Sequence, residues 1–573
     1  MSEVRLGRVF LGWCRSCNLP LLSRVCSLCG ADANVVNITP PGDYRPAFPG
    51  EVERMEGVIE RDFGVLLHLT HPTILNKIPD IDEMREVING GLVIGAIRYD
   101  IFAERERFLP RVPFAQKLVD EGTDKFVVAD SGAVSSVLKS SNLLCPGVVG
   151  CGDFDAGDEV MVIDGNKRVL AVGNARMGSD DIKDRGIAVK IRARERGGEK
   201  FLNGPLRGFE EVIKLEVEAN REHIESRVGS SVKFVRRVLS RNELPVACSL
   251  SGGKDSMATL LLLLEAGIEP TLLFTDTGLE FDETIEEVHR TAESTGLKLI
   301  EESARSDFWS DIGIFGNLGR DHRWCCKTRK LAPMVKLIDE NFPEGVLTFI
   351  GQRRYESMNR AKHGSIWKNP WLKKQVGVSC IQNWNAMEVW LYLFSRDART
   401  NPLYERGFER IGCWLCPASD LFDFELFKHR DHERYFSYLK EHYDDEAVSL
   451  GLWRFRDPPN WAPENHMRIE EKREGCVVPE GAKLRIRGDR ERIDNISKAI
   501  GVSVFDGMGR ENEKLVRKIV YRANYCAGCG LCETGCENNA IYLRDGKSWI
   551  SEDVCISCGS CLDLLCPATE YMD

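Results

Sequence analysis

Runs of hydrophobic residues divide the 573-residue chain into segments with different periodicity. Residues 41–120 mix strand-like apolar runs such as GVLLHLT and GLVIGAIRYD with Pro and Gly breaks, and they predict an α/β accessory segment. Residues 124–177 carry short alternating strands, one small helix and several Gly turns, a spacing that fits a small β-barrel. Residues 201–243 are amphipathic and predict one helical connector. Residues 244–267 change from a strand to a glycine loop and then to a helix.

The composition is that of an ordinary soluble protein with several domains. Single hydrophobic cores stop growing near about 250–300 residues, so a chain of this length should hold more than one. Hydrophobic residues make up 43% and charged residues 29% of the chain. No window approaches about 18 uninterrupted apolar residues, and MSEVRLGRVF lacks an apolar signal core. We therefore expect a cytoplasmic protein with no membrane partner.

The net charge of −11 argues against a protein that wraps nucleic acid over its whole surface, but it leaves a local basic groove open. The 21 cysteines are the stronger global signal. In a chain without an export signal they indicate metal ligands rather than disulfides. Most of them are clustered near the start, in the middle and at the end of the chain.

The first cluster, CRSC and CSLC, consists of two C-x2-C knuckles separated by eight residues. Each knuckle directs two thiolates at one point, which suits a tetrahedral ion. We expect a structural zinc ribbon over residues 1–40, with a rubredoxin-like iron as the alternative. The predicted zinc ligands are Cys14, Cys17, Cys26 and Cys29.

Four short sequence motifs resemble those of the PUA domain, an RNA-binding module. In chain order they are DSGAV, CPGVV, AGDEVMVID and LAVGNARM. We place this PUA-like module at residues 121–200. The resemblance implies an RNA partner, and we expect tRNA. The basic run at residues 182–200 is either a solvated strand or linker, or a phosphate-contacting edge. The RNA-binding candidates on this edge are Lys190, Arg192, Arg194 and Arg196.

The segment LPVACSLSGGKDSMATLLLLLEAG places a glycine loop between a strand and a helix. Its backbone N–H groups can close on an anion at the helix N-terminus, where the helix dipole adds attraction. The loop resembles the SGGxDS PP-loop of ATP pyrophosphatases, enzymes that cleave ATP between its α and β phosphates. We expect Lys254 and Asp255 to be exposed on this anion-binding loop.

Further marks resemble the phosphoadenosine-phosphosulfate (PAPS) reductase family within that superfamily. They are LLFTDTGLEFDET, IGQRRYES, IQNWNAMEVWLYL and NPLYERGFERIGCWLCP. The resemblance implies a parallel sheet flanked by helices, an adenine nucleotide α-hydrolase-like domain at residues 244–470, with the nucleotide at the carboxyl ends of the strands. The implied nucleotide-binding residues are Ser249, Ser251, Gly252, Gly253, Lys254, Asp255, Ser256, Asp276, Thr277 and Gly278. The catalytic candidates are Lys254, Asp255, Asp276, Arg353 and Arg354.

The adjacent cysteines in RWCCKTRK are poorly placed to bond to each other, because the linking peptide would be strained in bringing their sulfurs to about 2.05 Å. CWLC follows after 86 residues. This layout resembles the adenosine-phosphosulfate (APS) reductase branch, in which four thiolates bind one [4Fe–4S] cluster. Zinc and buried structural thiols are the alternatives. The cations of KTRK would lower thiolate pKa values and hold an anionic ligand. The implied ligands are Cys325, Cys326, Cys413 and Cys416.

CAGCGLCETGC and CISCGSCLDLLCP form an internal repeat that resembles a bacterial two-cluster ferredoxin, with two zinc knuckles as the alternative. In such ferredoxins the fourth cysteine of each run serves the other cluster. We place this α+β domain at residues 521–573, after a small α/β connector at residues 471–520. One [4Fe–4S] cluster would use Cys526, Cys529, Cys532 and Cys566, and the other Cys555, Cys558, Cys561 and Cys536.

Residues 351–374 interleave basic and aromatic side chains, and they are either an RNA path or a solvated, partly packed loop. The residues concerned are Arg353, Arg354, Arg360, Lys368, Lys373, Lys374, Tyr355, Trp367 and Trp371.

Three functions are compatible with these features. The first is an RNA-modifying enzyme that adenylylates a base carbonyl with ATP and Mg²⁺ and then transfers sulfur from a donor, with an electron donor serving the ferredoxin domain. The second is a PAPS or APS reductase. The third is an RNA-binding redox sensor. Reductases carry a catalytic cysteine in a Glu-Cys-Gly-Leu-His-like setting, but the nearest candidate, Cys476 in KREGCVV, has different flanks. This difference and the intact SGGKDS loop favour the first function.

Overall fold

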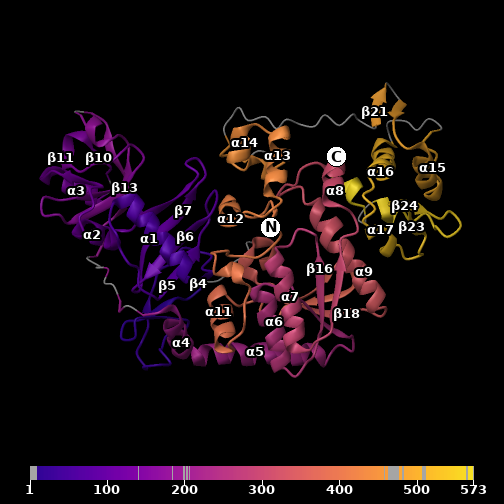
Figure 1. Cartoon of the computed structure of the whole chain (residues 1–573), viewed down its shortest axis with the longest axis horizontal. Coiled ribbons are helices and arrows are strands. Elements are labelled where there is room, and N and C mark those ends of the chain that lie inside the picture. The colour runs from indigo at the N-terminus through magenta and orange to yellow at the C-terminus, as the bar shows by residue number, and fades with distance from the viewer. Residues whose placement is uncertain are drawn as a thin grey trace. The chain divides into compact units, whose positions relative to one another are not determined.

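The computed structural model describes residues 9–139, 141–183, 185–197, 201, 204–205, 207–456, 459–462, 477–480, 483–505, 512–562 and 566–571 (Figure 1). The chain divides into two compact units. The first consists of residues 1–230, 353–362 and 383–409, and the second of residues 231–352, 363–382 and 410–573. Across the described ranges, no helix is both long and apolar enough to cross a membrane.

The first unit begins with a small antiparallel sheet that carries the N-terminal cysteines. Its strands are β1 (Gly12–Cys14), β2 (Leu19–Leu21) and β3 (Asn34–Val35), in the order β2-β1-β3. Buried Leu19, Leu21 and Cys26 pack against Val212 and Ala219 of the following helical segment. So short a segment has little core of its own, and it depends on this packing and on its cysteines.

The accessory segment forms an antiparallel five-stranded sheet with two helices. The strands follow in chain order across the sheet: β4 (Tyr44–Pro46), β5 (Thr73–Lys77), β6 (Met84–Asn89), β7 (Leu92–Asp100) and β8 (Arg105–Pro110). Helix α1 (Pro49–Phe63) begins with proline, which suits the first helical turn, and ends at Gly64 with a left-handed φ of 67°. Helix α2 (Val112–Asp120) packs on β7 and on the next module.

The PUA-like module is a six-stranded sheet in the order β10-β14-β13-β12-β9-β11. The pair β9–β12 is parallel and the other pairs are antiparallel. Its core consists mainly of aliphatic side chains that alternate along the strands, as a half-buried sheet requires. The elements are β9 (Phe126–Ala129), α3 (Ser131–Lys139), β10 (Leu143–Leu144), β11 (Val148–Cys151), β12 (Glu159–Ile163), β13 (Val169–Ala175) and β14 (Ile187–Arg194).

The range expected to form one helical connector contains two helices, α4 (Phe209–Ala219) and α5 (Arg221–Leu239). Asn220 separates them. Its side-chain amide donates to the Pro20 carbonyl at 2.9 Å, and its side-chain oxygen accepts from the Leu22 N–H at 2.7 Å. These bonds join the connector to the N-terminal sheet, so a contact distant in sequence breaks the expected single helix.

Glu216 on α4 supplies a pH-dependent contribution to stability. Its side chain is buried, and burial raises the pKa of Glu216 to about 8 from its ordinary value of 4.5. Between pH 4.5 and pH 8, the Glu216 carboxyl is therefore protonated in the folded state and ionised in the unfolded state, so folding takes up a proton. Local stability falls as pH rises through this window and levels off above it.

Glu216→Gln is expected to remove this pH dependence and to stabilise α4 at pH 8 by on the order of 3 kcal/mol, because glutamine is buried without a charge. Hydrogen exchange of the α4 amides at pH 5.5 and pH 8 measures the effect. Glu211→Gln, at an exposed position of the same helix, is the control. Equal pH slopes in the wild type and Glu216→Gln would contradict the assignment.

Two late stretches of the range predicted for the catalytic domain group with the first unit. They carry a 3₁₀ turn (Arg354–Glu356), α10 (Met358–Lys362), α11 (Ala386–Ser395) and a 3₁₀ turn at Pro402–Tyr404. Asp43 Oδ1 accepts from Arg353 Nη1 and from the Ala386 N–H, both at 2.6 Å. Helix α11 packs on α4 and β4. Contacts between residues more than 300 positions apart in sequence therefore help to hold these stretches in the first unit.

The second unit contains a six-stranded sheet in the order β17-β16-β15-β18-β20-β19, parallel except for β19. Helix α9 packs on the face that includes Ala247 and Leu273. The alternate residue Cys248 faces the other side, where it lies near Cys380. The strands are β15 (Val246–Ser249), β16 (Thr271–Asp276), β17 (Leu299–Ser303), β18 (Val346–Ile350), β19 (Ile366–Asn369) and β20 (Leu372–Val378).

Helices connect these strands and follow the sheet. They are α6 (Lys254–Glu265), α7 (Asp282–Thr295), α8 (Phe308–Phe315), a π-helical turn (Cys326–Leu331), α9 (Ala332–Asn341), α12 (Leu421–Leu426), α13 (His432–His442), α14 (Asp445–Ser449) and a 3₁₀ turn (Leu452–Arg454). The strand order reverses at β15, which lies between β16 and β18. In open α/β sheets, ligands bind at the carboxyl ends of strands at such a switch point.

The C-terminal cysteine-rich range shares one hydrophobic core with the segment expected to be a separate connector. Helix α15 packs on the hairpin β23–β24, and α16 packs on α18. The elements are β21 (Val477–Glu480), β22 (Lys483–Ile486), α15 (Arg490–Ala499), α16 (Glu513–Asn524), α17 (Leu531–Thr534), β23 (Ile541–Arg544), β24 (Lys547–Ile550), a 3₁₀ turn (Ser560–Leu562) and α18 (Pro567–Tyr571). Cys476 lies outside the described residues.

Candidate functional site

The glycine loop lies at the switch point, between the end of β15 and the start of α6. Gly252 has a φ of 66°, a left-handed conformation that favours glycine, and a Cβ there would lie 3.0 Å from Thr284. Helix α6 is twelve residues long and begins at Lys254 directly after the loop. The N–H groups of its first turn and the positive end of its dipole can therefore attract an anion.

A serine hydroxyl group forms hydrogen bonds within the loop. Ser256 Oγ donates to the Gly253 carbonyl at 2.8 Å and accepts from the Ser251 N–H at 3.2 Å. The two loop residues expected to be exposed are instead largely covered. The Lys254 side chain is only 4% exposed, and its Nζ lies 3.3 Å from Asp255 Oδ2. The ammonium is thus held in place by a neighbouring carboxylate.

The loop that follows β18 lies close to the start of α6. Gly351, which follows β18, carries no side chain, and a Cβ there would lie 2.4 Å from the Asp255 carbonyl carbon and 2.5 Å from the Ser256 nitrogen. Only glycine allows this approach without moving the backbone. The sequence reasoning did not single out Gly351, although it is the first residue of GQRR in a motif already noted.

Gly351→Ala is expected to displace the start of α6 and to weaken nucleotide binding by about 1–3 kcal/mol, the usual cost of overpacking a tight site. Equilibrium dialysis with ATP measures the change. Gly313→Ala is the matched control, because no atom lies within 4 Å of a Cβ at Gly313. Unchanged ATP affinity in Gly351→Ala would show that this contact does not shape the site.

The end of β16 joins the nucleotide loop region to the central cysteines. Asp276 Oδ1 accepts from the Gly278 N–H at 2.8 Å and so shapes the turn that follows the strand. Thr277 Oγ1 lies 3.7 Å from Cys413 Sγ, and the Trp414 N–H donates to the Leu279 carbonyl at 2.9 Å. The residues predicted to bind nucleotide and those predicted to bind a cluster therefore adjoin each other.

The four central thiols, which we call the central quartet, gather at the π-helical turn. They are Cys325, Cys326, Cys413 and Cys416. The pKa of the Cys325 thiol is raised by its hydrogen bond with Cys326, by burial and by the nearby charges of the other three cysteines. π-Helical turns are rare and frequent at functional sites, and here the turn begins with Cys326, beside the adjacent Cys325.

Cationic groups surround part of the central quartet. The hydrogen bond from Cys325 and the charges of Lys330, Arg323 and Arg410 lower the pKa of Cys326 to about 6, against the effect of burial. The Arg329 side chain is directed at the turn after β16, where its Nε donates to the Thr277 carbonyl at 2.7 Å. Of the KTRK cations, Lys330 therefore serves the thiols, and Arg329 holds the end of β16.

A carboxylate that the sequence reasoning missed also lies at this junction. Glu280 Oε1 accepts from Thr277 Oγ1 at 3.0 Å and lies 3.8 Å from Cys413 Sγ. Burial raises the pKa of Glu280, and the charge of Lys330 opposes this shift. Glu280 belongs to TDTGLEFDET, but its separation from Cys413 in sequence gave no signal of their contact.

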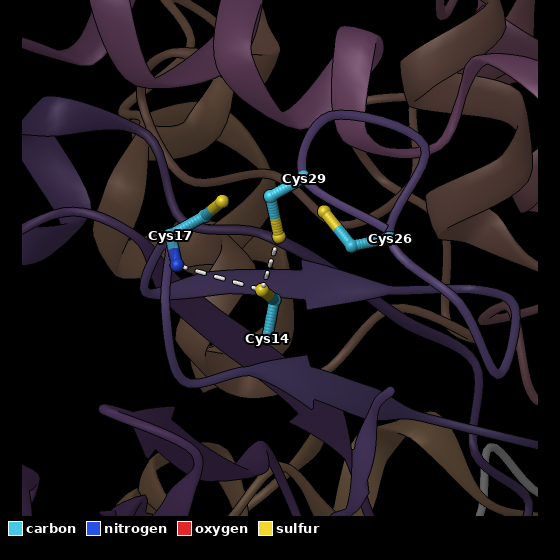
Figure 2. Close-up of side chains that lie close together, drawn as sticks. All are labelled: Cys14, Cys17, Cys26 and Cys29. Atoms are coloured by element: carbon cyan, nitrogen blue, oxygen red, sulfur yellow. Dashed lines mark hydrogen bonds between the residues drawn. The ribbon is translucent and has the colours of Figure 1, made fainter. Parts of the chain in front are cut away.

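The N-terminal cysteines converge on one point (Figure 2). Their ligand atoms all lie within 4.8 Å of one another. Cys14 Sγ and Cys29 Sγ are 3.5 Å apart, and Cys14 Sγ accepts from the Cys17 N–H at 3.4 Å. A tetrahedral zinc ion with Zn–S bonds of about 2.3 Å needs sulfurs about 3.8 Å apart. Within the described ranges no other His, Cys, Asp or Glu group is as compact.

The C-terminal cysteines line two cavities, each with the four residues predicted for one cluster. We call them the inner and the outer quartet. A cavity of about 20 Å³ is lined by the inner quartet, Cys526, Cys529, Cys532 and Cys566. A cavity of about 100 Å³ is lined by the outer quartet, Cys536, Cys555, Cys558 and Cys561.

Backbone and side-chain donors serve these thiols. Cys526 Sγ accepts from the Ser548 N–H at 3.3 Å, and Cys536 Sγ accepts from the Ala540 N–H at 3.4 Å. The buried Arg522 donates through Nη2 to Cys532 Sγ at 3.5 Å and through Nη1 to the Cys561 carbonyl at 2.6 Å. A buried cation beside several cysteines suits anionic thiolates in both quartets.

Aromatic side chains connect the inner quartet to the central quartet. Phe315 lines the cavity of the inner quartet. Its ring stacks on that of the fully buried Trp324, with ring centroids 5.2 Å apart. Trp324 directly precedes Cys325. A continuous packed path therefore joins the two cysteine sites, and neither aromatic residue stood out in the sequence.

The basic edge of the PUA-like module is only partly free for a ligand. Arg192 Nη2 pairs with Glu159 Oε2 at 2.7 Å, and Arg194 Nε donates to the Val137 carbonyl at 2.8 Å. Lys190 and Arg196 are exposed. Two of the four candidates thus also stabilise the module.

The basic and aromatic segment predicted either as an RNA path or as a packed loop makes many intramolecular contacts. The ring of Trp371 lies 4.0 Å from Lys327 Nζ, and Trp367 packs against Gly377. Lys373 pairs with Glu537 at 2.8 Å, and Lys374 pairs with Asp339 at 3.0 Å. These contacts favour the packed-loop alternative.

The two predicted catalytic arginines lie in the first unit. Arg353 is 2% exposed and forms the ion pair with Asp43, so it has a structural role there. Arg354 Nη1 donates to Asn383 Oδ1 at 3.3 Å. Their catalytic roles stay predictions. Lys254, Asp255 and Asp276 all lie in the second unit.

Comparison with known proteins assigns two of these regions. Residues 245–419 match the phosphoadenosine phosphosulfate reductase domain, and residues 125–194 match the PUA domain. These matches confirm the two resemblances seen in the sequence. The chain is therefore a multidomain α/β protein with a PUA domain and a reductase-type domain of the PP-loop superfamily.

Several relatives cover different shares of the chain. The Adenosine 5'-phosphosulfate reductase of Bacillus cereus (strain AH187) is 28% identical over 178 residues, which are 30% of this chain and 73% of that protein. Uncharacterized protein MJ0973 of Methanocaldococcus jannaschii is 27% identical over 433 residues, 74% of this chain and 97% of that protein.

Solved structures resemble single parts of the chain. A PAPS reductase from Candida auris in complex with phosphate is 17% identical, covers 34% of this chain and 96% of its own, and has a TM-score of 0.27. A conserved PUA domain protein from Thermoplasma acidophilum is 20% identical, covers 27% and 95%, and has a TM-score of 0.22. TM-scores this low support no assignment by themselves.

A more similar relative also extends over most of the chain. Uncharacterized protein MJ0066 of Methanocaldococcus jannaschii is 36% identical over 472 residues, which are 80% of this chain and 98% of that protein. At this identity and coverage the two share a common fold and descent. The chain belongs to the same protein family as MJ0066, and within it carries a PUA domain and a phosphoadenosine phosphosulfate reductase domain.

Proposed function

We propose that this protein is an ATP-dependent enzyme that transfers sulfur to RNA, with tRNA as the expected substrate. The observation that carries the proposal is the junction of the glycine loop region with the central quartet. Thr277, predicted to bind nucleotide, lies 3.7 Å from Cys413, predicted to bind a cluster. An activated nucleotide and a sulfur-binding group would then meet in one site, in a chain that also carries a domain of the RNA-binding PUA type.

The glycine loop would hold the phosphates of ATP. Its N–H groups and the start of α6 would face the β and γ phosphates, which leave as pyrophosphate, while Lys254 would neutralise the charge that develops on them. Asp255 and Asp276 are the carboxylates available to a Mg²⁺ ion, which prefers oxygen ligands and phosphate. Ser249, Ser251 and Ser256 supply further hydroxyl groups at the loop.

The cysteine sites fit the metal groups that the resemblances imply. The compact N-terminal quartet suits one zinc ion, whereas the central quartet is less compact, as the larger span of a [4Fe–4S] cluster requires. The inner and outer quartets each line a cavity with four thiols. When bound, clusters would supply single electrons at the inner and outer quartets and a sulfur-binding site at the central quartet. Thiolate ligands in this number need a reducing compartment, and we propose the cytoplasm.

The chemistry balances in two steps. The base carbonyl oxygen attacks the α phosphorus of ATP, so that a P–O bond to the base forms and pyrophosphate leaves. A hydrosulfide-level sulfur then attacks the activated carbon, a C–S bond forms, and the oxygen leaves with AMP. No net oxidation occurs with a hydrosulfide donor. A persulfide donor needs two further electrons, and an electron module would supply such electrons.

The packed path from the inner quartet to the central quartet supports electron delivery within the chain. Phe315 and Trp324 would bring the inner quartet into electronic contact with the central one. The outer quartet includes the exposed Cys558 and borders the exposed Ile556. We therefore propose that an external electron donor docks at the outer quartet.

The second candidate function is reduction of APS or PAPS, and the domain match at residues 245–419 favours it. That reaction needs a thiol nucleophile outside the metal sites. Cys248 and Cys380 are buried, and burial raises the pKa of both thiols, to about 12 for Cys380, so neither suits the role. Cys476 is the remaining candidate for this nucleophile between the central quartet and the C-terminal cysteines at residues 526–566. It lies outside the described residues.

One experiment separates the two functions. The purified protein is assayed under anaerobic conditions with ATP, APS or PAPS, with and without tRNA, and pyrophosphate, AMP and sulfite are measured. Sulfur transfer to RNA requires tRNA-dependent release of pyrophosphate and AMP from ATP. Sulfite from APS or PAPS without tRNA would establish the reductase instead. RNA binding without turnover of any nucleotide would indicate the third function, a redox sensor.

A further inference from the structure

A groove of about 490 Å³ lies in the first unit where three parts of the chain meet. One wall is the segment Val35–Thr39 that follows the N-terminal sheet, and another is formed by residues 91–93 and 111–113. The third is the end of β14 with the residues that follow it. Its volume lies within the range of small-ligand sites, about 300–1,000 Å³. Of the residues assigned above, only Arg192, Arg194 and Arg196 of the basic edge line this groove.

The charge of the groove is strongly unbalanced. Four arginines line it, Arg111, Arg192, Arg194 and Arg196, against one acidic residue, Glu86. The Glu86 carboxylate is already engaged, because it accepts from the Thr39 N–H at 2.9 Å, from Thr39 Oγ1 at 2.6 Å and from Asn76 Nδ2 at 2.8 Å. Glu159 pairs with Arg192 from outside the lining set. A local excess of positive charge remains in a protein of net charge −11.

The arginines repel one another in the groove. Burial and the nearby charge of Arg192 lower the pKa of Arg111, and Glu86 offsets this shift only in part. Like charges held together in a concave site are stabilised by a bound anion. Guanidinium groups also present a planar fork that matches phosphate oxygens, which a lysine cannot do.

The groove is not a property of the PUA domain alone. The PUA match covers residues 125–194, whereas Arg111, Arg196 and the segment Val35–Thr39 lie outside it. An isolated PUA domain therefore lacks two of the four arginines and two of the three walls. The site exists only because the N-terminal and accessory segments fold beside β14.

The rim offers apolar and amide groups beside the cations. Val35 is 63% exposed, Asn37 is exposed, and Leu92 is partly exposed. A ligand with only phosphate groups would leave this surface in water. A nucleotide of a single strand matches both features, because its phosphate pairs with arginine and its unstacked base covers apolar surface and can bond an amide.

We propose that this groove binds single-stranded RNA through a phosphodiester held by Arg111 and Arg196, with an adjoining base against Val35 and Asn37. The proposal rests on RNA being the substrate of the proposed function, and it names the single-stranded part of that substrate as the segment bound outside the PUA domain.

The test is binding of a fluorescein-labelled oligouridine to the full chain by fluorescence anisotropy at several salt concentrations. The variant Arg111→Glu/Arg196→Glu is expected to lose at least about tenfold in affinity at 0.1 M salt. The slope of log affinity against log salt should fall by about 0.7, the value for one lost phosphate contact on a single strand. Arg111→Lys/Arg196→Lys keeps the charges without the planar fork and should bind between the two. Arg192 and Arg194 are left intact, because they also hold the module together.

Arg168→Glu is the control for general charge, since it reverses one charge, half the change of the double variant, at an exposed turn of the same module that does not line the groove. Its affinity and salt slope should equal those of the wild type. Equal binding by Arg111→Glu/Arg196→Glu and the wild type would overturn the groove and leave the proposed function standing. An equal loss in Arg168→Glu would overturn it too, since the effect would then be general charge. Groove-dependent binding without tRNA-dependent pyrophosphate release would support the groove and refute the proposed function.

Discussion

Replacing Lys254 by methionine is expected to lower tRNA-dependent pyrophosphate release by about 100- to 1,000-fold, the usual effect of removing one group that stabilises developing charge. The structure explains why one side chain matters so much. Lys254 is 4% exposed, stands at the first position of α6, and its Nζ lies 3.3 Å from Asp255 Oδ2. A positioned ammonium in a water-poor site acts more strongly on phosphate than a mobile surface lysine does.

Methionine is chosen because it has nearly the same length and is apolar, so the buried stem of Lys254 keeps its packing. Steady-state kcat/KM for pyrophosphate release measures the effect, and the melting temperature reports on the fold. Lys298→Met, at an exposed position of the same unit, is the matched control and should keep full activity. Turnover of Lys254→Met within about threefold of the wild type would show that the glycine loop is not the catalytic phosphate site.

Local features of the fold follow directly from the sequence. The strand, glycine loop and helix at residues 244–267 are encoded within one short segment, and the structure has β15, the loop and α6 there. The PUA and reductase-type domains were also recognisable, because each is set by several marks in order. The helical connector expected at residues 201–243 consists of two helices divided at Asn220, whose partners Pro20 and Leu22 are about 200 positions away.

The candidate site was predictable where spacing encodes it. C-x2-C spacing brings thiols together by short-range geometry, so the quartets could be proposed residue by residue. Contacts that only the folded chain brings together could not be predicted from the sequence. Gly351 presses on Asp255, and Glu280 lies beside Cys413, although neither pair is close in sequence. Arg353 was assigned to the catalytic domain by its neighbours in sequence, yet the chain folds it against Asp43.

Changing Cys325 to serine is expected to uncouple the two halves of the proposed reaction. The charges of the other three central cysteines all act on Cys325, and it is one of the four predicted ligands, so its loss should abolish the cluster there. The protein should then lose about four of about twelve irons, one cluster of three. The inner and outer quartets are formed by residues 526–566 and should keep their iron. Ser251, Gly253 and Ser256 of the glycine loop bond to one another rather than to the central cysteines, so phosphate binding should continue.

The expected phenotype is therefore pyrophosphate release without thiolated RNA. Iron analysis and electron paramagnetic resonance measure the cluster, and mass spectrometry of digested tRNA measures the sulfur product. Cys325→Ala accompanies the serine variant, because a serine oxygen can replace a thiolate as a ligand. Cys151→Ser, an exposed cysteine outside all four quartets, is the control and should keep all iron and activity.

Each possible result has a distinct meaning when the Lys254 variant is measured beside the Cys325 variants. Loss of both pyrophosphate release and sulfur transfer in Lys254→Met, with loss of sulfur transfer alone in Cys325→Ser, fits activation at the glycine loop followed by sulfur delivery at the central quartet. Unchanged iron in Cys325→Ala would exclude a cluster there and leave zinc or buried thiols. Full sulfur transfer despite a lost cluster would show that the four thiols stabilise the junction near Thr277 and Trp414 and take no part in the chemistry.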